Sequence, residues 1–222
     1  MYSNYNIDAA FERASIERVM DRMDECGLHD CVKTDDYDEQ ISGSDIRALD
    51  SLEREHVIDV KSIAGNLPTF CQEVGNCHSG RVGWIIGKKS TTDYAYTYHT
   101  VKGCRGYFEG KKKMAYGDAE ILHDEIILVK RERLIGSLES QLGISLDEET
   151  ARRFMSEAMS MHDLENEKGT AYFNIRNGHL VEVSKYEHDP IYVTLSMSLR
   201  EKPLNIVVPK RMLASISEAH IG

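Results

Sequence analysis

Apolar side chains recur at helical intervals near the start of the chain. The pattern extends over residues 8–26 and predicts one helix, which Gly27 would stop. The side chains that would form the apolar face of this helix are Ile16, Val19, Met20 and Met23.

Beyond the helix, the pattern changes to the two-residue alternation of β-strands. Residues 45–49 and 55–62 predict an antiparallel pair joined by a charged turn, after an acidic and turn-rich connector over 30–44. Further strands are expected at 69–74, 80–86, 94–101 and 125–130.

The pattern changes again at residue 131. Two helices are predicted over 131–142 and 147–164, with Ser145 or Asp147 capping the second. We therefore predict an α+β protein with a core over 1–131 and an extension over 132–222 that is helical and then β-rich. The strands expected in this extension are 171–175, 180–183, 192–199 and 204–208, with Asn177-Gly178 as a hairpin turn between the first two.

Charge is distributed unevenly along the chain. The formal charge of −10 argues against a polyanionic partner. Residues 1–59, however, carry 16 acids and 6 bases, whereas residues 80–117 carry eight bases and two acids. This distribution fits a soluble surface with a basic loop, and equally an acidic site beside a basic strip that binds phosphodiesters. The eight bases are Arg81, Lys88, Lys89, Lys102, Arg105, Lys111, Lys112 and Lys113.

The sequence also indicates a compartment. It contains no run of 18 apolar residues, and its polar start does not have the pattern of a signal peptide. The five cysteines are odd in number and lack the CxxC spacing, so we expect reduced thiols in a cytoplasmic protein. The nine histidines have no zinc-ligand spacing.

One predicted strand carries an acid and a lysine that could take part in catalysis. Asp59 and Lys61 are two residues apart, so a strand directs both to one face. A carboxylate can hold a divalent cation, and a nearby ammonium can orient a water and a phosphate. Asp45 could join Asp59 across the predicted hairpin, and Glu73 could supply a further oxygen. Because a second acid-x-lysine triplet ends at Lys111, the motif alone is weak.

In their order, these residues resemble a family. Ser44-Asp45-Ile46-Arg47, Val57-Ile58-Asp59-Val60-Lys61, Gly65-Asn66 and Gln72-Glu73-Val74 resemble the PD-(D/E)xK nuclease superfamily, and more narrowly its small phage-borne members. The resemblance covers roughly residues 8–131. The proline of the family name is absent before Asp45, and Thr92 replaces the alanine usual before Asp93.

The resemblance implies a fold, a cofactor and an activity. The fold would be a restriction-endonuclease-like mixed β-sheet flanked by helices, and the activity would be metal-dependent hydrolysis of nucleic acid, DNA in preference to RNA. Asp45, Asp59 and Glu73 would bind Mg²⁺ or Mn²⁺, with Glu12 as a further acid from the first helix. Lys61 would be the catalytic lysine, and the eight bases would hold the phosphate backbone. A homodimer is expected as well, because such nucleases often act in pairs.

Several alternatives remain open from the residues. Asp50 competes with Asp45 for the first carboxylate role, and Asp93 fits a structural acid better than a ligand. Glu12 could simply sit at the frayed end of the first helix, and Glu73 could be a solvated acid. The face shared by Tyr94, Tyr96 and Tyr98 could be core or a stacking surface. The excess of acids at 35–39 has no catalytic explanation, so a non-catalytic inhibitor or nucleic-acid mimic that binds a protein through this acidic region is the rival function.

Overall fold

The computed structural model of the chain describes residues 5–34, 36, 43–65, 67–87, 89–101 and 121–222. Two compact units make up the protein. The expected boundary after residue 131 coincides with one passage between them, but both units are discontinuous in sequence. The first comprises residues 1–67, 90–131 and 214–222, and the second comprises 68–89 and 132–213.

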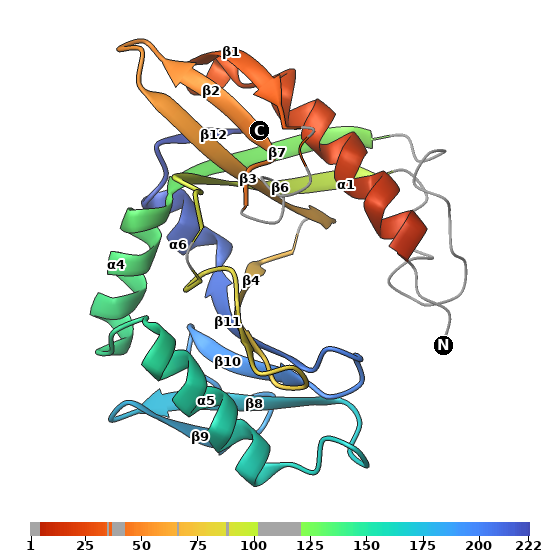
Figure 1. The fold of residues 1–222 in the computed structure, drawn as a ribbon, viewed down its shortest axis with the longest axis vertical. Helices are drawn as coiled ribbons and strands as arrows, with labels where there is room; N and C mark the ends of the chain where they lie inside the picture. The colour runs from red at the N-terminus through yellow and green to blue at the C-terminus, as the bar shows by residue number, and fades with distance from the viewer. Residues whose placement is uncertain (1–4, 35, 37–42, 66, 88, 102–120) are drawn as a thin grey trace. The chain divides into compact units, whose positions relative to one another are not determined.

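The first unit is built on a six-stranded mixed sheet (Figure 1). All neighbouring strands are antiparallel except β3 and β6, which are parallel. The chain between these two strands passes through the second unit, and this long connection is what a parallel pair requires. In spatial order the strands are β1 (Leu28–Lys33), β2 (Ile46–Asp50), β3 (Glu55–Ala64), β6 (Asp93–Val101), β7 (Ile121–Lys130) and β12 (Ala219–Ile221).

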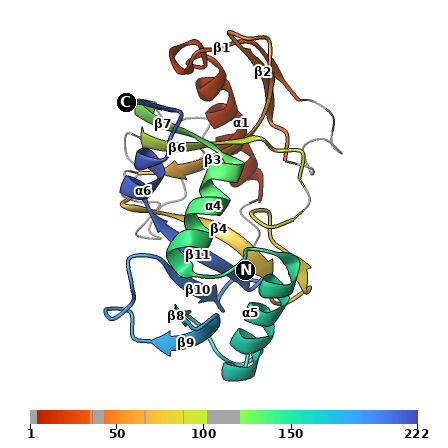
Figure 2. The same ribbon diagram turned by 90° about the vertical axis from the view of Figure 1, so that its left-hand side faces the viewer.

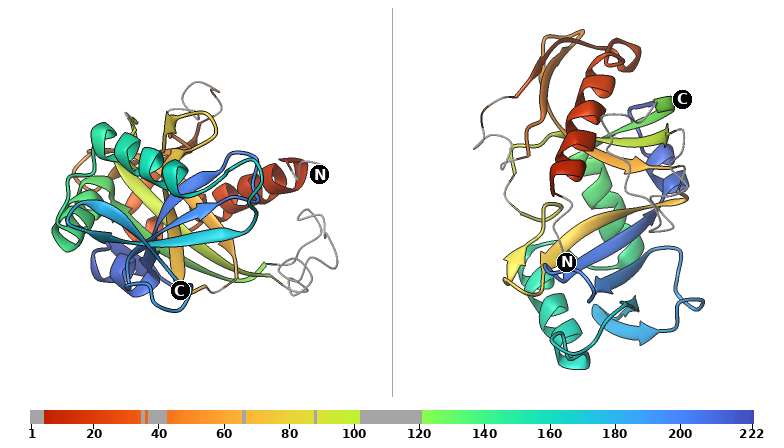
Figure 3. Two further views of the ribbon diagram at one scale, coloured as in Figure 1. Left: turned by 90° about the horizontal axis from the view of Figure 1, so that it is seen from below. Right: turned by 90° about the vertical axis from the view of Figure 1, so that its right-hand side faces the viewer.

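Helix α1 (Tyr5–Met20) lies across one face of this sheet (Figure 3). Ile16, Val19 and Met23 pack in one cluster with Ile58 and Val60 of β3. The predicted helix over 8–26 is thus confirmed in outline, although it ends earlier and is followed by a 3-10 turn (Asp24–Cys26). Gly27 follows with a φ of 77°, a left-handed conformation that favours glycine.

The second unit contains another six-stranded sheet, and helix α5 (Glu148–Met161) covers one of its faces (Figure 2). Asp147 caps α5, because its Oδ1 accepts a hydrogen bond from the Thr150 backbone N–H at 2.8 Å. Helix α4 (Arg131–Leu142) has the predicted bounds, and the short helix α6 (Lys210–Ser215) was not foreseen. The strands in spatial order are β5 (Arg81–Val82), β4 (Thr69–Asn76), β11 (Pro203–Pro209), β10 (Tyr192–Ser196), β8 (Thr170–Arg176) and β9 (His179–Val183).

The elements confirm an α+β protein and correct several expectations. The predicted connector over 30–44 begins as strand β1, and the strand predicted over 80–86 is only the two residues of β5. The predicted strand at 69–74 forms as β4, but it pairs with β11 and β5 in the second sheet. No helix in the described part of the chain is long and apolar enough to cross a membrane.

Two glycines give a matched test of the packing in the second unit. A Cβ built on Gly83 would lie 2.1 Å from the Glu73 carbonyl oxygen, whereas one on Gly136 of α4 would meet open space. We expect Gly83→Ala to lower the free energy of unfolding by about 1–3 kcal/mol or more, because backbone must move. Gly136→Ala should raise it by up to about 1 kcal/mol through helix propensity. Urea unfolding followed by circular dichroism measures both; equal stabilities of the two variants would contradict this packing.

A candidate metal-binding carboxylate pair

The alternation of β3 separates an apolar face from a polar one. Ile58 and Val60 point toward α1, so Asp59 and Lys61 point from the opposite face of the sheet. Asp45 lies immediately before β2, and its backbone N–H donates to the Ile58 carbonyl at 2.9 Å. This pairing brings the Asp45 side chain beside Asp59, as the hairpin expectation required.

The two carboxyl groups form a buried pair. Asp45 is 8% exposed and Asp59 is 4% exposed. A side-chain hydrogen bond joins them, and the backbone N–H of Val60 donates to Asp45 Oδ2 at 2.7 Å. Burial, together with the negative charge of Asp59, raises the pKa of Asp45 to about 7, although the Val60 N–H and Lys61 oppose this shift. Asp45 therefore keeps its proton to higher pH than an exposed aspartate does.

Lys61 places a positive charge beside this pair. Its Nζ lies 2.7 Å from Asp59 Oδ1, and its side chain is 23% exposed. The lysine is thus held by one carboxylate while part of its surface reaches solvent. A water or phosphate oxygen that approached Asp59 would meet an ammonium group already in position.

Two further residues extend the site, and sequence reasoning did not assign them to it. Tyr94 of β6 is the register partner of Asp59, it is fully buried, and the positive charge of Arg131 acts on its hydroxyl. Burial raises the pKa of Tyr94, with the charge of Asp59 acting in the same direction. Arg131 begins α4, and its backbone N–H donates to the Thr92 carbonyl at 2.8 Å. In the sequence, Arg131 could have been singled out because the Lys130-Arg131 pair directly follows an apolar strand.

The donor set fits a small divalent cation. Two buried carboxyl groups in contact repel each other when both are ionised, and a cation between them would offset that repulsion. No group of three His, Cys, Asp or Glu side chains suited to a metal occurs among the described residues. Mg²⁺ is commonly held by one or two carboxylates and keeps several waters, so a pair is sufficient for it. The pair would suit Mn²⁺ for the same reason.

Asp50 and Asp93, the other acids considered for this region, have structural contacts instead. The first accepts hydrogen bonds from the backbone N–H groups of Leu52 and Arg54 and pairs with the Arg54 side chain, which holds its pKa well below the usual range. Buried Asp93 accepts from His56 Nδ1 at 2.8 Å and from the Thr92 hydroxyl at 2.7 Å. Asp50 therefore stabilises the β2–β3 turn, and Asp93 fixes His56.

Two predicted ligands are not part of the described pair. Glu73 belongs to β4 in the second unit, in register with Asn205, and its Oε1 lies 4.0 Å from Arg81 Nη2. Glu12 belongs to α1, which packs on the other face of β3, and its side chain lies outside the described residues. The ligand roles of Glu73 and Glu12 stay predictions.

The expected basic strip is described only in part. Arg81 is largely exposed on β5, and Lys89 is half-buried; both belong to the second unit. The nucleic-acid contacts of all eight bases stay predictions. Those that lie outside the described residues are Lys88, Lys102, Arg105, Lys111, Lys112 and Lys113.

Comparisons with known proteins add no family to this geometry. No family model, curated protein or solved structure matches the chain. Any assignment of function therefore depends on the arrangement of Asp45, Asp59 and Lys61.

The repulsion within the carboxyl pair predicts how the stability of the protein depends on pH. The folded-state pKa of Asp45, about 7, lies above the ordinary value of about 4, so ionisation opposes folding as pH rises through that interval. Asp45→Asn keeps an acceptor for the Val60 N–H and removes the repulsion. In a metal-free buffer its stability gain should be small below pH 4, grow between pH 4 and 7, and stay constant above, reaching on the order of a few kcal/mol.

Urea unfolding of wild type and Asp45→Asn at several pH values in EDTA measures this gain. Asp21→Asn, which changes an exposed aspartate at the end of α1, is the control and should show no such trend. If the stability gain of Asp45→Asn is the same at pH 4 and pH 8, repulsion between the two carboxyl groups does not lower the stability of the fold, and the prediction is wrong.

Proposed function

We propose that the protein is a metal-dependent nuclease that hydrolyses phosphodiester bonds of nucleic acid. The observation that carries the proposal is the contact between the Asp45 and Asp59 carboxyl groups on one face of β3, with Lys61 Nζ 2.7 Å from Asp59. Two carboxylates and a lysine are the groups that metal-assisted attack of water on a phosphodiester needs.

Each residue has a role in this proposal. Asp45 and Asp59 would hold Mg²⁺, or Mn²⁺ in its place. When bound, the cation supplies Lewis acidity toward the scissile phosphate and acidifies a coordinated water. Lys61 orients the attacking water and stabilises negative charge on the phosphate oxygens. The charge of Arg131 acts on the Tyr94 hydroxyl, and the buried Tyr94 ring lies beside Asp59 of β3.

The fold is compatible with a restriction-endonuclease-like core. Asp59 and Lys61 lie on β3, and Asp45 directly precedes β2, the antiparallel partner of β3; the sheet continues through the parallel strand β6. We extend the proposal to a DNA substrate in preference to RNA, to phosphate contacts from the basic residues of 80–117, and to a homodimer. The origin in a phage or mobile element is part of the same proposal.

Cleavage assays test the proposal directly. Plasmid, single-stranded DNA and RNA are incubated with the full chain in Mg²⁺, Mn²⁺ or EDTA. We expect products only with a metal, and a loss of at least about a hundredfold in rate for Asp59→Asn and Lys61→Met, because each removes a group that acts in the reaction. Asp21→Asn should cut like wild type. Full activity of Asp59→Asn, or cleavage in EDTA, would contradict the proposed site.

A measurement of metal binding tests the cation site independently of nuclease activity. Titration of Mn²⁺ by electron paramagnetic resonance should show one tight site in wild type that is lost in Asp59→Asn and weakened in Asp45→Asn, because each substitution removes a charged ligand. Binding of Mn²⁺ without cleavage of any substrate would favour the rival function, a non-catalytic binding protein with an acidic surface. Unchanged binding in both variants would place the metal elsewhere.

A further inference from the structure

A second polar cluster lies on the opposite face of the first sheet, beneath α1. The Ser15 hydroxyl is 2.6 Å from His99 Nε2, and His99 Nδ1 is 2.5 Å from Asp124 Oδ1. The side chain of Arg18, one turn along α1, lies 2.6 Å from Asp124 Oδ2. Ser62 of β3 and Thr97 of β6 complete the cluster through their hydroxyl groups, both of which contact Ser15.

The hydrogen-bond pattern fixes the state of the histidine. A carboxylate only accepts, so Nδ1 of His99 carries the proton toward Asp124. In the neutral ring Nε2 then accepts from the Ser15 hydroxyl. The order serine, histidine, aspartate is that of a hydrolase triad. Ser15 and His99 are fully buried, however, so no substrate reaches this serine and the cluster serves to hold α1.

The charges of the cluster balance only while His99 is neutral. The charged groups facing the ring from the described elements are Asp124 on β7 and Arg18 on α1. Arg22, in the turn after α1, donates from Nη1 to the Asp124 carbonyl at 2.9 Å. A protonated His99 would place a fully buried cation near the partly exposed Arg18, with one carboxylate between them. Burial accordingly lowers the pKa of His99, although Asp124 acts against this shift.

We propose that Ser15, Arg18, His99 and Asp124 form a pH-sensitive latch that holds α1 on the sheet at neutral pH and loosens it when the solution becomes acidic. Among the described side chains, α1 and the turn after it attach to the sheet through apolar residues (Ile16, Val19, Met20 and Met23) and through these polar contacts, so loss of the polar contacts weakens the attachment. Thr97 Oγ1 also lies 3.3 Å from the Lys61 carbonyl, which connects the latch to the strand that carries Asp59.

The direction of the pH effect follows from the lowered pKa. Above the unfolded-state pKa of about 6.5, His99 is neutral in both states and the latch contributes fully. As pH falls below that value, the detached state binds the proton more readily than the attached one, and the contribution is lost. Asp45 acts in the opposite direction, since its protonation favours the fold, so a local measurement on α1 is needed.

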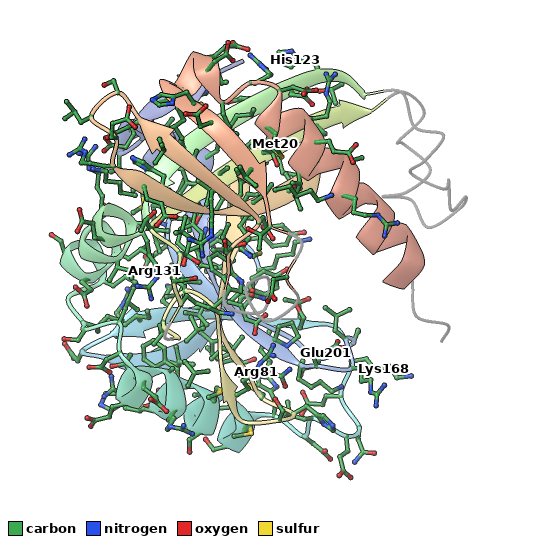
Figure 4. The ribbon with its side chains drawn as sticks, turned by 45° about the horizontal axis from the view of Figure 1, so that its top comes forward. Met20, Arg81, His123, Arg131, Lys168 and Glu201 are labelled. Atoms are coloured by element: carbon green, nitrogen blue, oxygen red, sulfur yellow. The ribbon has the colours of Figure 1, made fainter. Side chains whose placement is uncertain are left out.

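Hydrogen–deuterium exchange of the full chain at pH 7.5 and 5.5 provides that measurement. After correction for intrinsic exchange rates, peptides covering residues 13–20 should exchange several-fold faster at pH 5.5 in wild type. His99→Gln should remove the difference between the two pH values, whatever its absolute protection. His123→Gln should keep the wild-type response, because His123 is an exposed histidine on the same strand β7 as Asp124 (Figure 4).

A second measurement needs only the wild-type protein, so it still tests the proposal if the His99→Gln variant fails to fold. Nitrogen-15 NMR of the histidine rings should show His99 protonated at Nδ1 alone at pH 7.5, and its ring should gain a proton over the interval in which α1 loses protection. Equal protection of α1 at both pH values would overturn the proposal. So would a His99→Gln variant that keeps the wild-type response, or a His99 ring that stays neutral while α1 is released.

Discussion

The alternation of side chains along β3 is the constraint on which the first unit depends. Ile58 and Val60 enter the apolar core under α1, so Asp59 and Lys61 must face the other way. A shift of one residue in register would bury the charged pair under the helix and expose the apolar one. The same register with β2 sets Asp45 against Asp59 and forces two carboxyl groups into contact. The polar site is therefore a consequence of how the core is packed.

Both faces of the sheet carry buried ionisable groups, but their electrostatic balance differs. On the α1 face, Asp124 is matched by Arg18 and by a neutral His99, so the cluster is satisfied at neutral pH. On the other face, Lys61 forms an ion pair with Asp59, and burial beside Asp59 raises the pKa of Asp45. A carboxyl pair whose negative charge is only partly compensated is suited to bind a cation. A cluster whose charges are balanced is suited to stabilise the packing of a helix on a sheet.

Local patterns in the sequence were sufficient for most elements. Helical spacing located α1, α4 and α5, and the Asn177-Gly178 turn has positive φ at both residues, as a hairpin of this type requires. Strand partners were harder, because pairing depends on contacts distant in sequence. Strand β4 has an ordinary strand pattern, yet its neighbour β11 lies more than a hundred residues further along the chain. Strand β1 was missed because its exposed positions resemble a polar connector.

The site could be predicted only as far as it is local. Asp59 and Lys61 share a strand, and Asp45 joins them through a short hairpin. Tyr94 and Arg131 reach the same face through the β3–β6 and β6–β7 pairings, which periodicity does not reveal. The His99 cluster joins α1, β3, β6 and β7, and no spacing in the sequence connects Ser15 with His99 and Asp124.

The central claim is that Asp45 and Asp59 form one cation site. A crystal of the protein soaked in Mn²⁺ and measured at the manganese absorption edge tests this most directly. The account predicts an anomalous difference peak within about 2.0–2.3 Å of a carboxylate oxygen from each residue, with Lys61 still close to Asp59. A peak bound to other side chains, or none at a saturating Mn²⁺ concentration, would contradict it.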